Sequence, residues 1–215
     1  MPKPKRDLRS GASGKARHER RNCLWAFVRG LSLVSCDRIQ KLKLLKMKNL
    51  QTRLMIENVN AQVTPLPGRA FIGVITNCVR EARASIDIIQ FEWKWYHHEH
   101  NSPIQQLSYE VLQAGRRRIK IRVLLNKENP RHPLTPINKN TIRNLENVGI
   151  SAKFGPSSPI THAKLWIIDS EITVLGSHNL SKRAVSVNDE TSVKIVSKEV
   201  AGEFSRYFET LWNRQ

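Results

Sequence analysis

From about residue 60 to the end of the chain, apolar runs alternate with short polar segments rich in turn-forming residues. The segment "PLPGRAFIGVITNCVREARA" (65–84) places its apolar residues on one helical stripe, and this spacing predicts a helix. The run "SIDIIQFEW" (85–93) follows, and a continuous apolar run of this length is typical of a buried strand. A second helix is predicted to start at Ser102-Pro103 and to end before Gly115.

The same alternation continues to the C-terminus. The remaining predicted elements are a strand at 119–125, a helix ended by Gly149, a short strand at 150–154, two apolar runs separated by the turn Asp169-Ser170-Glu171, a strand near 190–197 and a closing helix that carries Val200, Phe204, Tyr207, Phe208 and Leu211. This order predicts an α/β fold with a mixed, largely parallel sheet flanked by helices on both faces.

The first 58 residues differ from the rest in composition. They are predicted to be a basic, partly disordered N-terminal extension, because residues 1–22 are too polar to pack. Met47 and Met55 are alternative starts, which leaves open whether residues 1–46 belong to the native protein. Residues 59–215 are predicted to form one domain.

The charge of the chain indicates an anionic partner. The formal net charge is +18; residues 1–50 hold fourteen Lys and Arg against three acidic residues, which leaves +7 for the remainder. Phosphate contacts release counterions and give affinity that does not depend on sequence, so nucleic acid is favoured as the partner. A membrane surface is the less favoured alternative.

The segment "CLWAFVRGLSLVSC" (23–36) is the nearest approach to a targeting signal. It is shorter than a membrane span and Arg29 interrupts its apolar run, so a cytoplasmic location is favoured. Export or membrane attachment through residues 1–36 is the alternative. Three cysteines without CxxC spacing suggest neither a disulfide framework nor a zinc site.

The candidate chemistry is concentrated in "THAKLWIIDSEITVLGSHN" (161–179). On a strand, residues two apart share a face, so His162 and Lys164 are expected to lie together, with Ser177 and Asn179 brought beside them from the neighbouring strand. The set supplies an imidazole that can act as nucleophile, base or acid, a cation, and two neutral hydrogen-bond donors. These groups suit a phosphodiester, whose charge the cation and donors can neutralise without a metal or cofactor.

The spacing H-x-K, four residues, D, six residues, G-S-x-N resembles the signature of the phospholipase D superfamily, and the sequence matches it without a gap. The similarity covers roughly residues 60–213. It implies a phospholipase D-type fold and a phospholipase D-like catalytic domain in the nuclease-like branch.

The resemblance also implies the roles of the site residues. His162 would be the nucleophile that forms a phosphohistidine, with Lys164, Ser177 and Asn179 as phosphate ligands. Asp169 would be supporting rather than reacting. Within "VSVNDE" (185–190), Glu190 would be the carboxylate that orients a histidine.

The chain carries this motif once. In-line displacement needs a nucleophile on one side of phosphorus and an acid on the other, and one imidazole cannot serve both in the same step. Short members of the superfamily pair two chains across a two-fold axis, which implies a homodimer with a composite active site.

The segment "FEWKWYHHEH" (91–100) has two interpretations. Its aromatic residues, Trp93 among them, could stack bases beside Lys94, which would make both substrate-binding residues. Alternatively the aromatics pack the core and the three histidines are solvated, or, less often, bind a metal.

Together these features predict a metal-independent phosphodiesterase, most simply an endonuclease acting on DNA or RNA through a phosphohistidine. The first alternative is a phospholipase D or phosphatidyl transferase acting on phospholipid headgroups. The second is a non-catalytic nucleic-acid-binding module. Fold and motif alone do not determine the substrate.

Overall fold

The structure is a computed structural model that describes residues 59–129, 131–156 and 158–214. The predicted N-terminal extension (1–58), including the candidate targeting segment, lies outside the described residues. Within the described part of the chain, no helix is both long enough and apolar enough to cross a bilayer.

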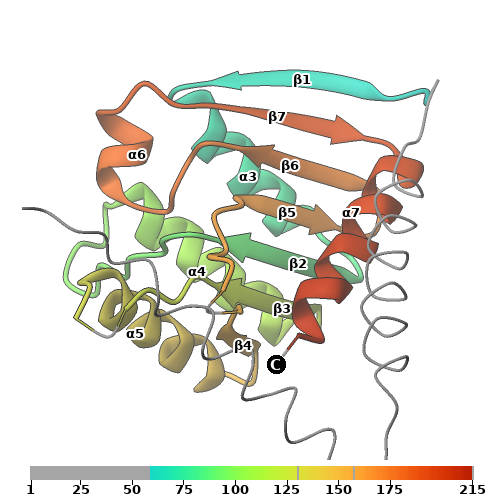
Figure 1. The fold of residues 1–215 in the computed structure, drawn as a ribbon. Helices are drawn as coiled ribbons and strands as arrows, with labels where there is room; N and C mark the ends of the chain where they lie inside the picture. Colours follow the sequence, from blue (N-terminus) through green and yellow to red (C-terminus); the bar gives the residue numbers. More distant parts are fainter. Residues whose placement is uncertain (1–58, 130, 157, 215) are drawn as a thin grey trace, which may run out of the picture. The chain divides into compact units, whose positions relative to one another are not determined.

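The domain is built on one seven-stranded sheet (Figure 1). In spatial order its strands are β1 (Gln62–Pro67), β7 (Thr191–Val196), β6 (Ile172–Gly176), β5 (Leu165–Ile168), β2 (Ser85–Gln90), β3 (Lys120–Leu125) and β4 (Ser151–Phe154). Only β2–β3 and β3–β4 are parallel pairs, and the other four pairs are antiparallel.

The α/β class with a mixed sheet is confirmed, but the prediction of a largely parallel sheet is wrong. The turn Asp169-Ser170-Glu171 joins β5 directly to β6, and a tight turn can join only antiparallel strands. The alternation of strands and helices in the first half of the domain indicates parallel pairing. The hairpin in the second half adds antiparallel strands to the same sheet.

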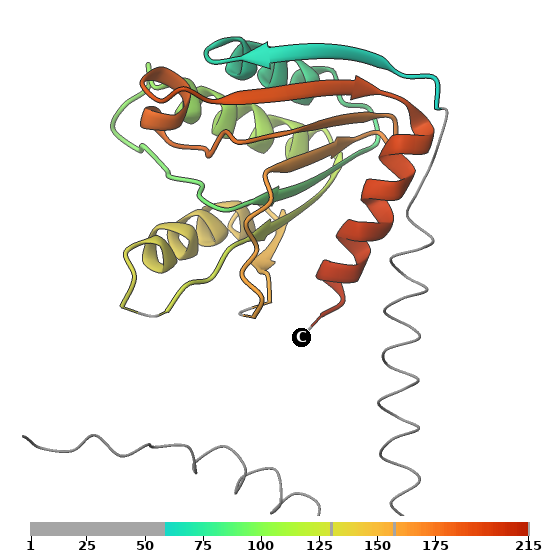
Figure 2. The same ribbon diagram turned by 45° about the horizontal axis from the view of Figure 1, so that its top comes forward.

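Helices cover both faces of the sheet, as predicted (Figure 2). Helices α3 (Ala70–Glu81), α4 (Pro103–Arg116) and α5 (Leu134–Glu146) contribute to one apolar cluster, and α7 (Lys198–Trp212) contributes to the other. Side chains alternate between the faces of a strand, so Ile88 packs in the first cluster and Ile89 in the second. This burial on both faces explains why β2 reads as a continuous apolar run.

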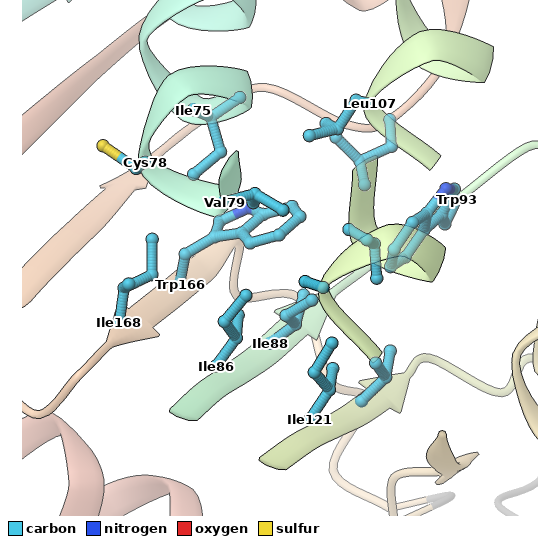
Figure 3. Packing of buried hydrophobic residues seen from close by; sticks show 14 of the residues in the cluster. Ile75, Cys78, Val79, Ile86, Ile88, Trp93, Leu107, Ile121, Trp166 and Ile168 are labelled. Atoms are coloured by element: carbon cyan, nitrogen blue, oxygen red, sulfur yellow. The ribbon is translucent and has the colours of Figure 1, made fainter. Parts of the chain in front are cut away.

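Figure 3 shows the first cluster from close by. Trp166 of β5 lies among Ile75 and Val79 of α3, and Ile86 and Ile88 extend from β2 toward the same helices. This packed layer supports the ends of β2 and β5, where the motif residues are located.

Two elements were not predicted. Strand β1 contains Pro65 and Pro67, and proline normally argues against a strand. The two prolines are two residues apart, so the missing N–H groups are on the same edge of β1, and the opposite edge still pairs with β7. Because β1 pairs only with β7, its proline-containing edge is tolerated. Helix α6 (Lys182–Ser186) is a short turn of helix between β6 and β7.

The strand directions bring the motif segments to one end of the sheet. Antiparallel pairing sets Leu165, the first residue of β5, opposite Leu175 near the end of β6, and Gly176 opposite Ser192 near the start of β7. The end of β2 lies here as well, since Ile89 pairs with Leu165. We call this the site end of the sheet.

Candidate active site

His162 and Lys164 lie side by side immediately before β5, in irregular backbone rather than in the predicted strand. Lys164 Nζ donates to the His162 carbonyl oxygen at 2.8 Å and lies 3.3 and 3.4 Å from the two ring nitrogens. Lys164 is 8% exposed, whereas His162 is exposed. A buried cation therefore lies against an imidazole that solvent and substrate can reach.

Phe91 forms one wall of this pair. Its ring centroid is 4.7 Å from that of His162 and 5.0 Å from Lys164 Nζ, within the range of a cation–π interaction. The contact joins the end of β2 to the start of β5, so the aromatic segment of the sequence does not by itself reveal it.

A buried amide holds the segment that carries His162. Asn126, which follows β3, accepts the backbone N–H of Thr161 at 2.9 Å through Oδ1. Asn138 of α5 donates to the carbonyls of both Asn126 and Phe91 and accepts the N–H of Trp93. The only sign of this network in the sequence is a polar residue, Asn126, directly after a buried strand.

Glu190 lies half-buried just before β7, at the site end of the sheet. Burial lowers the pKa of Lys164, and the Glu190 carboxylate opposes that shift. Glu190 Oε1 accepts from Asn188 Nδ2 at 3.1 Å, and its backbone carbonyl accepts the N–H of Gly68 at 2.8 Å. Among the described residues, no hydrogen bond joins Glu190 to His162, so its predicted orienting role stays a prediction.

Ser177 and Asn179 follow β6 into the same region. The backbone N–H of Gly176 donates to the Lys164 carbonyl at 3.3 Å, which brings the Gly-Ser-His-Asn turn beside the lysine as the sequence predicted. The Ser177 hydroxyl accepts the N–H of Thr191 at 3.0 Å and is 3.3 Å from the Thr191 carbonyl. Asn179 Oδ1 is buried and has no partner among the described residues.

Gly176 is needed at this turn for a steric reason. A Cβ at this position would clash with the Thr191 carbonyl oxygen and the Ser192 Cα, because β7 passes directly against it. Any larger residue would push apart the two strands that carry Ser177 and Glu190.

His178, to which the sequence assigned no role, ties three parts of the site together. Its Nε2 is 2.9 Å from the Gly68 carbonyl oxygen and its Nδ1 is 2.7 Å from Ser192 Oγ. A carbonyl only accepts, so Nε2 carries the proton and the Ser192 hydroxyl donates to Nδ1. Burial lowers the pKa of His178, and the Gly68 hydrogen bond and the Glu190 carboxylate oppose this. The neutral imidazole therefore joins the Gly-Ser-His-Asn turn to Gly68, whose backbone N–H donates to the Glu190 carbonyl.

Asp169, to which the resemblance gives a supporting rather than a reacting role, does not lie beside His162 and Lys164. It follows β5, whereas Lys164 precedes it, so five extended residues separate their Cα atoms by about 16 Å. Its carboxylate accepts three backbone N–H groups, from Arg83, Ala84 and Ser85, at 2.7 to 2.9 Å. These contacts hold the start of β2 against the β5–β6 turn.

The prediction that Trp93 binds the substrate is corrected. It is fully buried, and its indole N–H donates to Ser108 Oγ at 2.9 Å, so the core alternative holds and its ring cannot stack on a substrate. Lys94 is exposed, and its Nζ lies 5.4 Å from the centroid of the Tyr96 ring. In the described ranges, no cluster of three or more His, Cys, Asp or Glu side chains could hold a metal ion.

A match to a known protein family identifies this domain. A family model described as "Cardiolipin synthase, PLD-like domain" matches residues 75–212, which include every motif residue. The chain belongs to the PLD-like domain family. The fold agrees: Nuc from Salmonella typhimurium, a phospholipase D family member, matches with a TM-score of 0.59 at 19% identity, over 72% of this chain and 94% of that one.

Two other solved structures are similar to this chain, and one of them is a phosphatidylserine synthase. NucT from Helicobacter pylori matches with a TM-score of 0.58 at 19% identity, over 71% of this chain and 96% of its own. Phosphatidylserine synthase from Haemophilus influenzae matches with a TM-score of 0.57 at 13% identity, over 74% of this chain and 40% of its own. These likenesses show the shared fold alone.

Among curated sequences, 5'-3' exonuclease PLD3 of Xenopus laevis is 24% identical over 169 residues, or 74% of this chain and 32% of its own length. The virion nicking-joining enzyme of Monkeypox virus is 24% identical over 144 residues, or 65% of this chain and 31% of its own. The chain spans about a third of the length of these relatives.

Proposed function

We propose that this chain is a phosphodiesterase that cleaves nucleic acid through a phosphohistidine, without a metal. The observation that carries the proposal is the pairing of exposed His162 with buried Lys164, beside Glu190 and the turn that bears Ser177 and Asn179. This pairing offers one nucleophile and one fixed cation at a single accessible point.

In the proposed first step, a ring nitrogen of His162 attacks phosphorus, forming a P–N bond as the bond to the leaving oxygen breaks. The leaving oxygen takes a proton from an acid on the opposite side. In the second step, water attacks phosphorus and gives a proton to the conjugate base of that acid, and the P–N bond breaks to return the imidazole. Lys164 and the Asn179 amide would stabilise the charge on the non-bridging oxygens throughout.

Three features support nucleic acid as the substrate. The chain beyond residue 50 carries a net charge of +7. Three of its similar proteins, from Xenopus laevis, Xenopus tropicalis and Rattus norvegicus, are named 5'-3' exonuclease PLD3. Lys94 presents an exposed cation after β2, at the site end of the sheet.

The first prediction concerns substrate and metal together. In EDTA, the full chain is expected to cut closed circular single-stranded DNA, or RNA, because Lys164 supplies the charge that a metal would otherwise supply. The rate at low substrate should fall steeply with salt, with a log–log slope of several units, since about one unit is lost per phosphate contact. Cleavage of a circle specifically tests an endonuclease.

The control substrates separate the alternatives. A phospholipase or phosphatidyl transferase, which the family description and the synthase neighbour favour, would hydrolyse anionic phospholipid vesicles and leave DNA and RNA intact. A non-catalytic module, suggested by the structural match to the archaeal chromatin protein TrmBL2, would bind nucleic acid without cutting it or bis(p-nitrophenyl) phosphate. Loss of activity in EDTA, restored by Mg²⁺, would contradict the metal-free mechanism.

We further propose that two chains form a homodimer with a composite site, in which His162 of the partner subunit supplies the acid. One motif per chain supports this, because one imidazole cannot serve both sides of phosphorus. Ile160, two residues before His162, is an exposed apolar side chain, and the buried Asn179 oxygen has no partner among the described residues. Both features suit a site completed by another molecule.

A second prediction tests the dimer. Ile160→Asp is expected to raise the dimer dissociation constant by about tenfold or more, because it places a charge in an apolar contact, and activity should fall in parallel as protein is diluted. Tyr207→Asp, an exposed position on α7, is the matched control and should change neither. Light scattering that finds a fully active monomer would contradict the dimer requirement.

A further inference from the structure

A pocket lies next to the motif residues but contains none of them. It has a volume of about 710 Å³ and lies between α6 and the loop that joins β2 to α4. Figures 1 and 2 both show α6 and this loop side by side. The residues that matter for its chemistry are His98, His100, Pro103, Lys182, Arg183 and Val187.

Backbone contacts hold this pocket in a defined position relative to the motif. Leu180 N–H donates to the Glu92 carbonyl and Lys94 N–H donates to the Leu180 carbonyl, both at 2.9 Å. These two hydrogen bonds hold the loop after β2 against the segment after Asn179. Lys182 begins the pocket only three residues after Asn179, a separation of at most about 11 Å. A strand bound at Asn179 is therefore within reach of the pocket.

Two lysines gather at one aromatic ring beside the pocket. Lys94 Nζ and Lys182 Nζ lie 5.4 and 4.9 Å from the same ring centroid, that of Tyr96, whose hydroxyl oxygen accepts the Lys182 backbone N–H at 3.0 Å. Lys182 also pairs with Glu99. Arg183 is exposed, and no carboxylate pairs with it in the described part of the chain, so its guanidinium is the free cation of the pocket.

The pocket is also apolar in part. Val187 is 68% exposed, the largest exposed fraction among the large hydrophobic residues of the described chain, and Pro103 lines the pocket with it. The volume lies in the range of about 300–1,000 Å³ that is usual for small-ligand sites. A free guanidinium beside an apolar surface suits a ligand with a phosphate and a flat, weakly polar ring, which describes a nucleotide.

We propose that this pocket binds one unpaired nucleotide of the substrate strand, next to the phosphodiester held at His162. Arg183 contacts the phosphate of that nucleotide, and Val187 and Pro103 pack against its base or sugar. A base inside a duplex is covered by its partner and stacked neighbours, so it cannot enter a pocket without leaving the helix. The pocket therefore makes single-stranded nucleic acid the preferred substrate, an inference that rests on the proposed nuclease function.

The test compares a long and a small substrate on the full chain. A single-stranded 12-mer oligonucleotide reaches both the site and the pocket, whereas bis(p-nitrophenyl) phosphate has no flanking nucleotide. For Arg183→Ala, the ratio of kcat/KM for the oligonucleotide to kcat/KM for the small substrate is expected to fall about tenfold, because a charge-assisted hydrogen bond is lost. Arg116→Ala removes an exposed arginine at the far end of α4 and should keep the ratio within about twofold.

The outcomes distinguish the pocket from the function on which it rests. If wild-type protein cuts the oligonucleotide and Arg183→Ala leaves the ratio unchanged, the pocket proposal is overturned and the nuclease function stands. If wild-type protein cuts only bis(p-nitrophenyl) phosphate, the nuclease proposal fails and the pocket proposal fails with it. The same 12-mer as a duplex should show no greater loss for Arg183→Ala than for Arg116→Ala, and an equal tenfold loss on the duplex would refute the selection of an unpaired nucleotide.

Discussion

Replacing His162 with alanine is expected to lower phosphodiester hydrolysis by about 10³-fold or more while leaving the fold intact. The side chain is exposed, and without the imidazole the buried Lys164 ammonium still donates to the backbone carbonyl of residue 162, so we expect no packing defect in the core. The measurement is kcat on bis(p-nitrophenyl) phosphate, with far-ultraviolet circular dichroism and thermal unfolding as checks of the fold.

A matched control separates loss of the nucleophile from loss of any histidine near the site. His97 is exposed in the loop after β2 and lies outside both the motif and the pocket, so His97→Ala should keep nearly full activity. Acid-labile labelling of the protein by a radioactive phosphodiester should appear in wild type and disappear in His162→Ala. A folded His162→Ala protein that keeps most of its turnover would rule out the phosphohistidine.

Lys164 needs a different substitution, because it is buried. Lys164→Met keeps a buried aliphatic stem and removes the ammonium, which lies over the Phe91 ring and which the proposed mechanism needs for the phosphate oxygens. Its activity should fall nearly as far as that of His162→Ala.

Replacing Asp169 with alanine is expected to have the opposite effect, a large loss of stability with little loss of intrinsic activity. Three backbone N–H groups would lose a charged acceptor, and alanine is strained at the positive φ of 53°. The free energy of unfolding should fall by about 3 kcal/mol, which lowers Tm by roughly 6–12 °C in a domain of this size.

Two further variants make this second expectation sharp. Asp169→Asn keeps an oxygen acceptor and tolerates the backbone conformation, so it should lose less stability than alanine. Asp189→Ala removes an exposed carboxylate beside Glu190 and should leave stability nearly unchanged. At a temperature where each variant is folded, kcat should match wild type; a stable Asp169→Asn protein without activity would show that Asp169 takes part in the reaction after all.

Most of the elements could be predicted from local patterns. The helix predicted within 65–84 is seen as α3, although its first three residues belong to β1, the apolar run from Ser85 is seen as β2, and the Ser102-Pro103 start begins α4, which runs one residue past Gly115. The Gly-Ser-His-Asn turn lies beside Lys164 because the tight hairpin brings the end of β6 next to the start of β5; the strand expected at His162 and Lys164 is irregular backbone instead.

What the sequence by itself determined is the set of candidate groups and the hairpin that gathers them, since both depend on residues close together in the chain. The tertiary structure decided which of those groups meet: β5 is only four residues long, yet it separates Asp169 from Lys164 by its full length and turns one motif letter into a structural anchor. The tertiary structure likewise buried Trp93, placed Phe91 and Asn126 against the His162 segment, and formed the pocket at Arg183. These contacts join strands and loops that are distant in sequence, and they arise only when the order and direction of all seven strands are set by packing on both faces of the sheet.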